Sequence, residues 1–167
     1  GVLAAFSQDA RIDITGGGTI EVNANPEQNT SGVTKGNYAL EVAAGGNLTM
    51  NYKDGEPGSN KVVLKGNIGM LTPDPWGNNA SNMIVALTTA DSTWNGVMHN
   101  GYYGSGRASE GEATLYLQNG ATWTNEKWGE TFVSKNNNSG AYTGSAWENF
   151  IGGESAAKAG NIFQNDD

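Results

Sequence analysis

Short runs of alternating apolar and polar residues recur along the chain, and most are followed by a brief break and a second run. Such alternation is typical of β-strands that bury one face. The breaks are rich in Gly, Asn and Asp and are too short for a helical crossover. The pattern predicts ten strands in five pairs, over 11–15 and 19–23, 38–43 and 47–52, 62–65 and 67–71, 83–87 and 92–95, and 113–117 and 121–124.

The first strands of the five pairs are spaced as if one unit were repeated. If Ile12, Leu40, Val62, Ile84 and Leu115 are equivalent, the numbering advances by 28, 22, 22 and 31 from one to the next. A base of about 22 residues, lengthened by loops, lies in the range of repeats that stack one coil upon the next. We therefore predict an all-β fold, a parallel β-helix (solenoid) with loop insertions between coils. The alternative is an antiparallel meander or sandwich, because each break is also compatible with a hairpin turn.

The prediction treats the 167 residues as a single domain with three parts. Residues 1–9 are an N-terminal lead-in, 10–133 form the coils, and 134–167 are an irregular cap or a truncated next coil. Segments rich in Gly, Pro, Asn and Ser are predicted to be loops between coils. These loops span 25–36, 53–60, 72–81 and 99–111.

The apolar residues of the alternating runs are predicted to form one inner column. Each buried side chain of this kind contributes roughly 1.5–3 kcal/mol. The predicted column contains Ile12, Ile14, Ile20, Val22, Leu40, Val42, Leu48, Met50, Leu64, Ile68, Met70, Leu115 and Leu117. The residues between them are predicted to face water, namely Asp13, Glu21, Glu41, Thr49 and Thr114.

Composition narrows the possible partners. Glycine contributes 25 residues, and only 16% of the residues are charged, against about 25% in a typical soluble domain. The net charge of −8 argues against a nucleic-acid interface, which needs clustered Lys and Arg, and against docking on an anionic membrane. The chain has no cysteine, which excludes disulfides, thiolate metal sites and cysteine nucleophiles.

Two segments carry a resemblance to a known family. Residues 91–96 read Asp-Ser-Thr-Trp-Asn-Gly, and residues 113–125 read Ala-Thr-Leu-Tyr-Leu-Gln-Asn-Gly-Ala-Thr-Trp-Thr-Asn. Residues 18–23 and 46–51 look like earlier turns of the same design. This succession, over roughly residues 10–130, resembles the passenger domains of bacterial autotransporter adhesins, which belong to type V secretion in Gram-negative bacteria.

The resemblance implies a right-handed β-helix that is exported through an outer-membrane β-barrel and serves attachment. On this basis we expect a noncatalytic, adhesin-like segment at the cell surface or outside the cell. Its expected partners are a host or bacterial surface glycan or protein and, in the full-length protein, the outer-membrane translocator barrel. The barrel is not among these residues, so we expect the chain to be a fragment of a longer protein.

Residues suited to catalysis are few. His99 is the only histidine, and we expect it to be solvent-exposed or locally hydrogen-bonded at the start of a loop. The alternative function is a polysaccharide lyase or glycosidase of β-helix fold; glycosidases need paired carboxylates. Asp13, Glu21 and Glu41 could stack on one outer face, but we expect no Arg or Lys in register beside them, so an exposed charged face is the favoured interpretation. A further alternative is a β-sandwich carbohydrate-binding module.

Aromatic residues in the predicted loops are the candidate binding residues. Rigid rings beside Gly and Asn offer contact area to sugars or proteins at low entropic cost, although the rings could also fold back over the coils. Trp94 and Trp123, at equivalent strand positions, are instead predicted to stack in the core. We expect no catalytic residue, no metal and no cofactor. The candidate binding residues are Trp76, Tyr102, Tyr103, Trp128 and Trp147.

Overall fold

The protein is all-β in the residues that its structure, a computed structural model, describes. The described residues are 3–22, 38–72, 80–102, 111–126, 147, 149–153 and 160–164. They contain short strands and no helix, and therefore no helix that could cross a membrane. The all-β part of the prediction is thus confirmed.

Three parallel sheets account for almost all of these strands. Sheet A has the order β1 (Leu3–Phe6), β4 (Tyr38–Ala43), β9 (Asn67–Thr72) and β12 (Met98–Tyr102). Sheet B has the order β2 (Arg11–Ile14), β5 (Asn47–Met50), β10 (Ser81–Leu87), β13 (Gly111–Leu117) and β15 (Asn149–Ile151). Sheet C has the order β3 (Gly18–Glu21), β8 (Val62–Lys65), β11 (Thr93–Asn95), β14 (Thr122–Asn125) and β16 (Asn161–Gln164).

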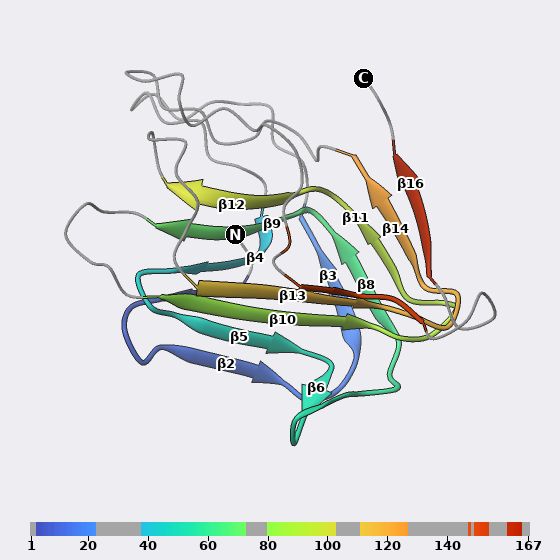
Figure 1. Ribbon diagram of the computed structural model, residues 1–167, viewed down its shortest axis with the longest axis horizontal. Helices are drawn as coiled ribbons and strands as arrows, with labels where there is room; N and C mark the ends of the chain where they lie inside the picture. Colours follow the sequence, from blue (N-terminus) through green and yellow to red (C-terminus); the bar gives the residue numbers. More distant parts are fainter. Residues whose placement is uncertain are drawn as a thin grey trace.

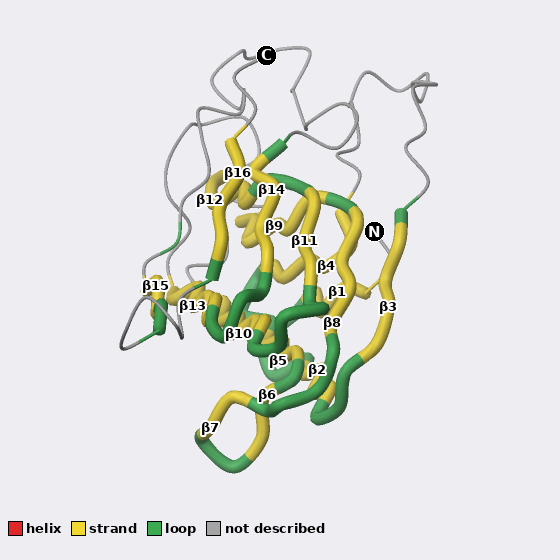
Figure 2. The backbone as a smooth tube through the Cα atoms, turned by 90° about the vertical axis from the view of Figure 1, so that its right-hand side faces the viewer, coloured by secondary structure: helices red, strands yellow, loops and turns green. Residues whose placement is uncertain are grey.

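The three sheets surround one interior, and each is a separate wall in Figures 1 and 2. Every ladder within sheets A, B and C is parallel, so the described strands do not form the antiparallel meander or sandwich. The antiparallel pairing in the described chain is a small hairpin of β6 (Tyr52–Lys53) and β7 (Glu56–Pro57), which projects from the corner after β5.

The predicted fold class, a right-handed parallel β-helix (solenoid) with loop insertions between coils, is wrong. The structure has several short parallel sheets instead, and ladder partners lie further apart in sequence than the predicted repeat. In sheet B, Ile12 pairs with Leu48, Leu48 with Met83, and Met83 with Ala113, in steps of 36, 35 and 30 along the sequence. The five residues taken as equivalent are in fact divided among all three sheets.

The physical reason is that alternation identifies a strand and a glycine identifies a corner, but neither identifies the sheet to which the strand belongs. The pair 38–43 and 47–50 runs from sheet A to sheet B, whereas the pair 62–65 and 67–72 runs from sheet C to sheet A. Further strands were missed, including β7 in the predicted loop 53–60 and β15 in the predicted cap. Strand β1 lies in the predicted lead-in, and β12 lies in the predicted loop 99–111.

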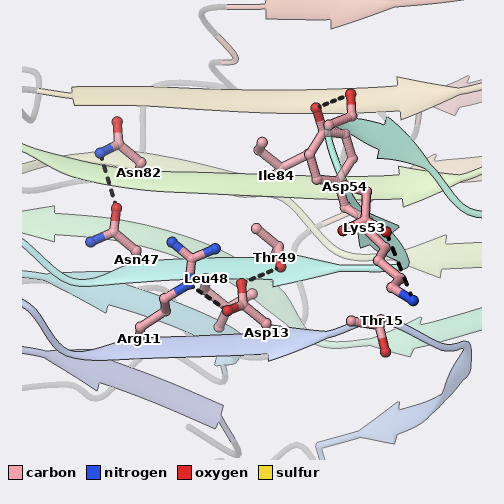
Figure 3. A pocket seen from close by; sticks show the side chains of 12 residues that line it. Arg11, Asp13, Thr15, Asn47, Leu48, Thr49, Lys53, Asp54, Asn82 and Ile84 are labelled. Atoms are coloured by element: carbon pink, nitrogen blue, oxygen red, sulfur yellow. Dashed lines mark hydrogen bonds and ion pairs between the residues drawn. The ribbon is translucent and has the colours of Figure 1, made fainter.

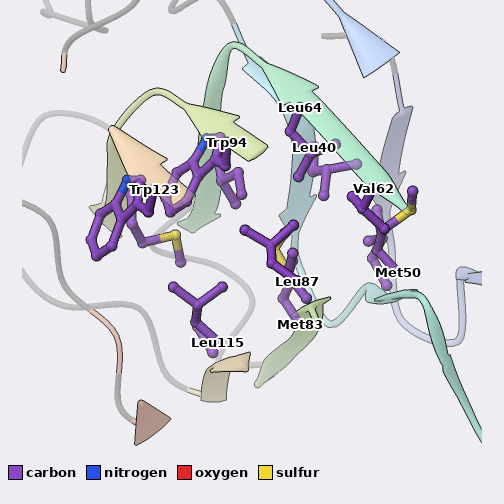
Figure 4. Packing of buried hydrophobic residues seen from close by; sticks show 14 of the residues in the cluster. Leu40, Met50, Val62, Leu64, Met83, Leu87, Trp94, Leu115 and Trp123 are labelled. Atoms are coloured by element: carbon purple, nitrogen blue, oxygen red, sulfur yellow. The ribbon is translucent and has the colours of Figure 1, made fainter. Parts of the chain in front are cut away.

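The interior is built from rows of inward-facing ladder partners (Figure 4). In sheet A the partners Leu40, Ile68 and Met98 are each fully buried. In sheet C, Trp94 pairs with Trp123, and their rings stack with centroids 4.7 Å apart and planes 6° apart. Each indole N–H donates to a backbone carbonyl 3.0 Å away. The prediction that these two tryptophans stack in the core is confirmed.

Most of the predicted core column is buried, with Ile12, Ile14, Ile20 and Val22, in or beside strands β2 and β3 at one end of their sheets, only half-buried. Of the residues predicted to face water, Glu41 is buried. Glu41 is in register with Gly69, which is in turn in register with His99, and His99 is buried as well.

The corners between strands need close backbone approach. Gly46 follows the turn after β4, and a Cβ there would lie 2.0 Å from the carbonyl oxygen of Ala5. Gly17 is similarly close to the carbonyl oxygen of Lys61. A side chain at either position would clash with the backbone of the neighbouring segment, which explains why these corners contain glycine.

Candidate functional site

An open groove of about 540 Å³ lies on the outer face of sheet B, beside the β6–β7 hairpin (Figure 3). It forms because β2, β5 and β10 are ladder neighbours, and alternate residues of each strand point outward. The hairpin supplies one side. The groove is lined by Arg11, Asp13, Thr15, Asn47, Leu48, Thr49, Tyr52, Lys53, Asp54, Gly55, Asn82 and Ile84.

A hydrogen-bonded group of three residues lies at the β2 edge of the groove. The Nε of Arg11 donates to Oδ2 of Asp13 in an exposed ion pair, and the Thr49 hydroxyl donates to the other carboxylate oxygen at 2.8 Å. The hydrogen bond from Arg11, and then that from Thr49, lowers the pKa of Asp13. Asp13 is therefore a carboxylate at neutral pH, and both of its oxygens are held in place.

A row of side-chain amides continues from this group across the strands. Arg11 is in register with Asn47, Asn47 with Asn82, and Asn82 with Glu112. The Asn82 amide N–H donates to Oδ1 of Asn47 at 3.1 Å, and the Asn47 amide donates to the Gly45 carbonyl at 3.2 Å. The amides are thus oriented by their neighbours, as Figure 3 shows for Asn47 and Asn82.

The hairpin places one aromatic ring at the groove. Tyr52 donates its hydroxyl hydrogen to the Gly55 carbonyl at 2.7 Å, and its ring lies 5.9 Å from that of Tyr116 on β13. Burial, and then the hydrogen bond with Tyr52, raises the pKa of Tyr116. The turn residues Asp54 and Gly55 have φ of 52° and 87°, as expected for a type I′ turn with the sequence Asp-Gly.

The hairpin is fixed to the sheets by Asn51, which is fully buried with φ of 53°. Its amide group donates to the carbonyls of Gly58, Asn60 and Ala86 at 3.1–3.2 Å. Its side-chain oxygen accepts from the Asn60 backbone N–H at 3.3 Å. Both ends of the hairpin are therefore held by one side chain, and the groove is preformed.

His99 lies away from the groove and differs from its prediction. It belongs to strand β12, not to a loop, and it is only 8% exposed. Its Nδ1 is 2.8 Å from the hydroxyl of Tyr38, which is far earlier in the sequence, and the two rings are stacked. Burial lowers the pKa of His99. The expectation of an exposed or locally bonded histidine was wrong because the strand β12 was not recognised.

The acidic residues do not gather as a carbohydrate-cleaving site would require. Asp13, Glu21 and Glu41 belong to sheets B, C and A respectively, so they do not stack on one face. A basic residue is nevertheless in register with Glu21, contrary to expectation, because Lys65 lies opposite it and forms an ion pair at 3.2 Å. Among the described residues, no three His, Asp or Glu side chains are close enough to hold a metal ion.

The predicted binding aromatics remain largely untested. Trp76, Tyr103 and Trp128 lie outside the described residues, as does the side chain of Tyr102, whose backbone ends β12. Trp147 is described and half-buried; its ring meets that of Trp94 edge-on, with centroids 5.7 Å apart at 89°. This contact is consistent with the alternative interpretation, in which a loop aromatic packs back onto the sheets.

Sequence reasoning missed the groove residues, although two signals were present. Asp54-Gly55 is a strong hairpin signal in a segment predicted as an insertion. Alternation also places Asn47 and Asn82 outward, but their proximity depends on a ladder between strands that are distant in the sequence.

The comparisons with known proteins add no relative: no family model matches the chain, and no curated protein or solved structure is significantly similar to it. What can be stated is therefore the class of architecture, an all-β protein of short parallel sheets with an open polar groove on one outer face.

Proposed function

We propose that this chain is a noncatalytic, adhesin-like segment that acts at the surface of a Gram-negative bacterium and attaches to a host or bacterial surface ligand. The supporting observation is the preformed open groove on sheet B, lined by amides, a hydroxyl, ion pairs and a tyrosine ring. The resemblance of the sequence to autotransporter passenger domains supports export through an outer-membrane barrel.

The arrangement of the groove favours binding over catalysis. A glycosidase needs one carboxylic acid with a raised pKa and a second carboxylate opposite it. The pKa of Asp13 is lowered instead, by Arg11 and Thr49. The other carboxylate at the groove, Asp54, lies on the exposed hairpin turn and forms an ion pair with Lys53 at 3.8 Å. The lowered pKa of Asp13 does not favour a role as a proton donor.

The scaffold also suits a binding role. The outward residues of three neighbouring strands are held by inward residues that are buried on β5 and β10 and half-buried on β2, so the lining residues keep their positions when no ligand is present. Rigid lining groups lose little entropy on binding, which favours affinity. Groups of this kind on a regular sheet are positioned more accurately than groups on loops.

Two assays on the same purified chain test the proposal. Beads that carry the chain are incubated with epithelial cells and with bacterial cells, and retained cells are counted against beads that carry albumin. In parallel, the chain is incubated with pectin, alginate and related polysaccharides, and unsaturated and reducing ends are measured over time.

We expect the beads to retain one of the cell types and the polysaccharides to remain uncut. Failure to retain any cell would contradict the attachment role. The appearance of new unsaturated or reducing ends would contradict the noncatalytic role and favour the lyase or glycosidase alternative.

A further inference from the structure

We propose that the groove on the outer face of sheet B binds a neutral oligosaccharide, which lies across strands β2, β5 and β10 beside the β6–β7 hairpin. This inference rests on the proposed function, because it assigns a chemical class to the surface ligand and a place where the ligand binds.

The charges of the groove are balanced in pairs. Arg11 is paired with Asp13, and Lys53 with Asp54. These four residues are the ionisable Asp, Glu, Lys and Arg side chains among those that line the groove. A polyanion would need cations without such partners, and a basic peptide would need free carboxylates. A ligand without net charge meets no uncompensated charge here.

The groove repeats hydrogen-bonding groups in rows. Asn47 and Asn82 lie on adjacent strands, and strands in a sheet are about 4.8 Å apart. Thr49 and Asp13 form a second row across β5 and β2. Arg11 contributes further donors, because within the described chain only its Nε is engaged. Closely spaced amides, carboxylates and guanidinium groups match the many hydroxyls of a sugar, each both a donor and an acceptor.

Apolar surface completes the match. Tyr52 and Ile84 line the same groove as the polar rows. The Tyr52 ring is fixed by its hydroxyl bond to Gly55 and by its contact with Tyr116. A fixed aromatic ring offers a flat surface to the C–H face of a pyranose at little entropic cost. Polar rows beside an apolar ring form a surface that favours sugars over purely apolar ligands.

Isothermal titration calorimetry tests the proposal with defined probes: the hexaoses of glucose, mannose, galactose, xylose and N-acetylglucosamine, with hexagalacturonate as the charged comparison. We expect at least one neutral hexaose to bind, with an affinity that is unchanged by added salt. Tyr52→Ala should weaken binding about tenfold and Asn82→Ala about fivefold, which correspond to the loss of one ring contact and one hydrogen bond.

Two matched variants serve as controls. Tyr52→Phe keeps the ring that would contact the sugar, so it should bind within about twofold of the parent chain. Asn149→Ala removes an exposed amide from the same face of sheet B outside the groove, and it should bind like the parent. Urea denaturation of Tyr52→Ala and Asn82→Ala, compared with the parent chain, shows whether a loss of binding comes from misfolding.

The result that overturns the inference is binding of hexagalacturonate alone, binding of no hexaose, or neutral binding that survives both Tyr52→Ala and Asn82→Ala. Each is distinguishable from failure of the proposed function. If beads still retain cells while no hexaose binds, the attachment role stands and the ligand class is wrong. If no cells are retained and a neutral hexaose binds, the ligand class is right and the attachment role is wrong.

Discussion

The inward-facing and outward-facing side chains of the strands in sheet B differ in burial and polarity. On β5, Leu48 and Met50 point inward and are 1% exposed, whereas Asn47 and Thr49 point outward and are half-buried. The inward side is apolar and packed, and the outward side is polar and open to a groove. The comparison indicates that the inner rows determine stability, whereas the outer rows carry the binding site that we propose. Substitutions on the two sides should therefore have separable effects.

The largest effect is expected from the inner row of sheet C. Trp94→Ala removes a fully buried ring that stacks on Trp123, and it should lower the free energy of unfolding by about 3–5 kcal/mol. Urea denaturation followed by circular dichroism measures this change. Thr93→Ala, at the exposed neighbouring position, is the control and should change it by less than about 0.5 kcal/mol. Equal effects of the two variants would contradict the comparison.

The second-largest loss of stability is expected at Asn51, whose buried side chain fixes the β6–β7 hairpin to the sheets. Asn51→Ala leaves three carbonyls without their donor and places alanine at positive φ, which together should cost about 3 kcal/mol. Asn51→Gly tolerates the backbone conformation and should lose about 1 kcal/mol less. A thermal unfolding series separates the two. If both variants retain full stability, the amide is not what anchors the hairpin.

The third effect depends on pH. His99 is buried and its pKa is lowered from 6.5, so the unfolded chain takes up a proton first as the pH falls. The stabilising contribution is therefore complete above about pH 6.5 and is lost progressively below it, at no more than about 1.4 kcal/mol per pH unit. Denaturation at pH values between about 7.5 and 5.5 measures the slope. His99→Gln should flatten it, and an unchanged slope would assign the dependence to other groups.

The smallest effect on stability is expected on the outer face. Asn82→Ala removes an exposed amide, and the free energy of unfolding should stay within about 0.5 kcal/mol of the parent value. The same urea titration as for Trp94→Ala makes the comparison direct. A loss as large as that of a typical buried hydrogen bond, about 1 kcal/mol or more, would mean that the outer amide row stabilises the fold, contrary to the division between the two sides.

Local features were well predicted from the sequence. Alternation located both strands of each pair, and Gly45-Gly46 and Asn119-Gly120 do lie at the corners that follow β4 and β13. Trp94 and Trp123 stack as their matching positions predict. These results depend on the few residues around each position, which explains why a single sequence was sufficient.

Non-local features were not predicted. The partner of each parallel strand is distant in the sequence, and corner glycines carry no information about which sheet comes next. Strand β12 was missed because Met98-His99-Asn100-Gly101 has polar residues where the chain packs against β9. The groove was missed for the same reason, since Asp13, Thr49 and Asn82 meet only through these ladders.

The central claim is that the outer face of sheet B, and not the other faces, carries the binding site. Amide chemical-shift mapping of the isotope-labelled chain, titrated with the tightest neutral hexaose, tests it most directly. We expect shifts confined to β2, β5, β10 and the β6–β7 hairpin, with Asn47 and Asn82 among the largest. Shifts centred on sheet A or sheet C, with these residues unmoved, would contradict it.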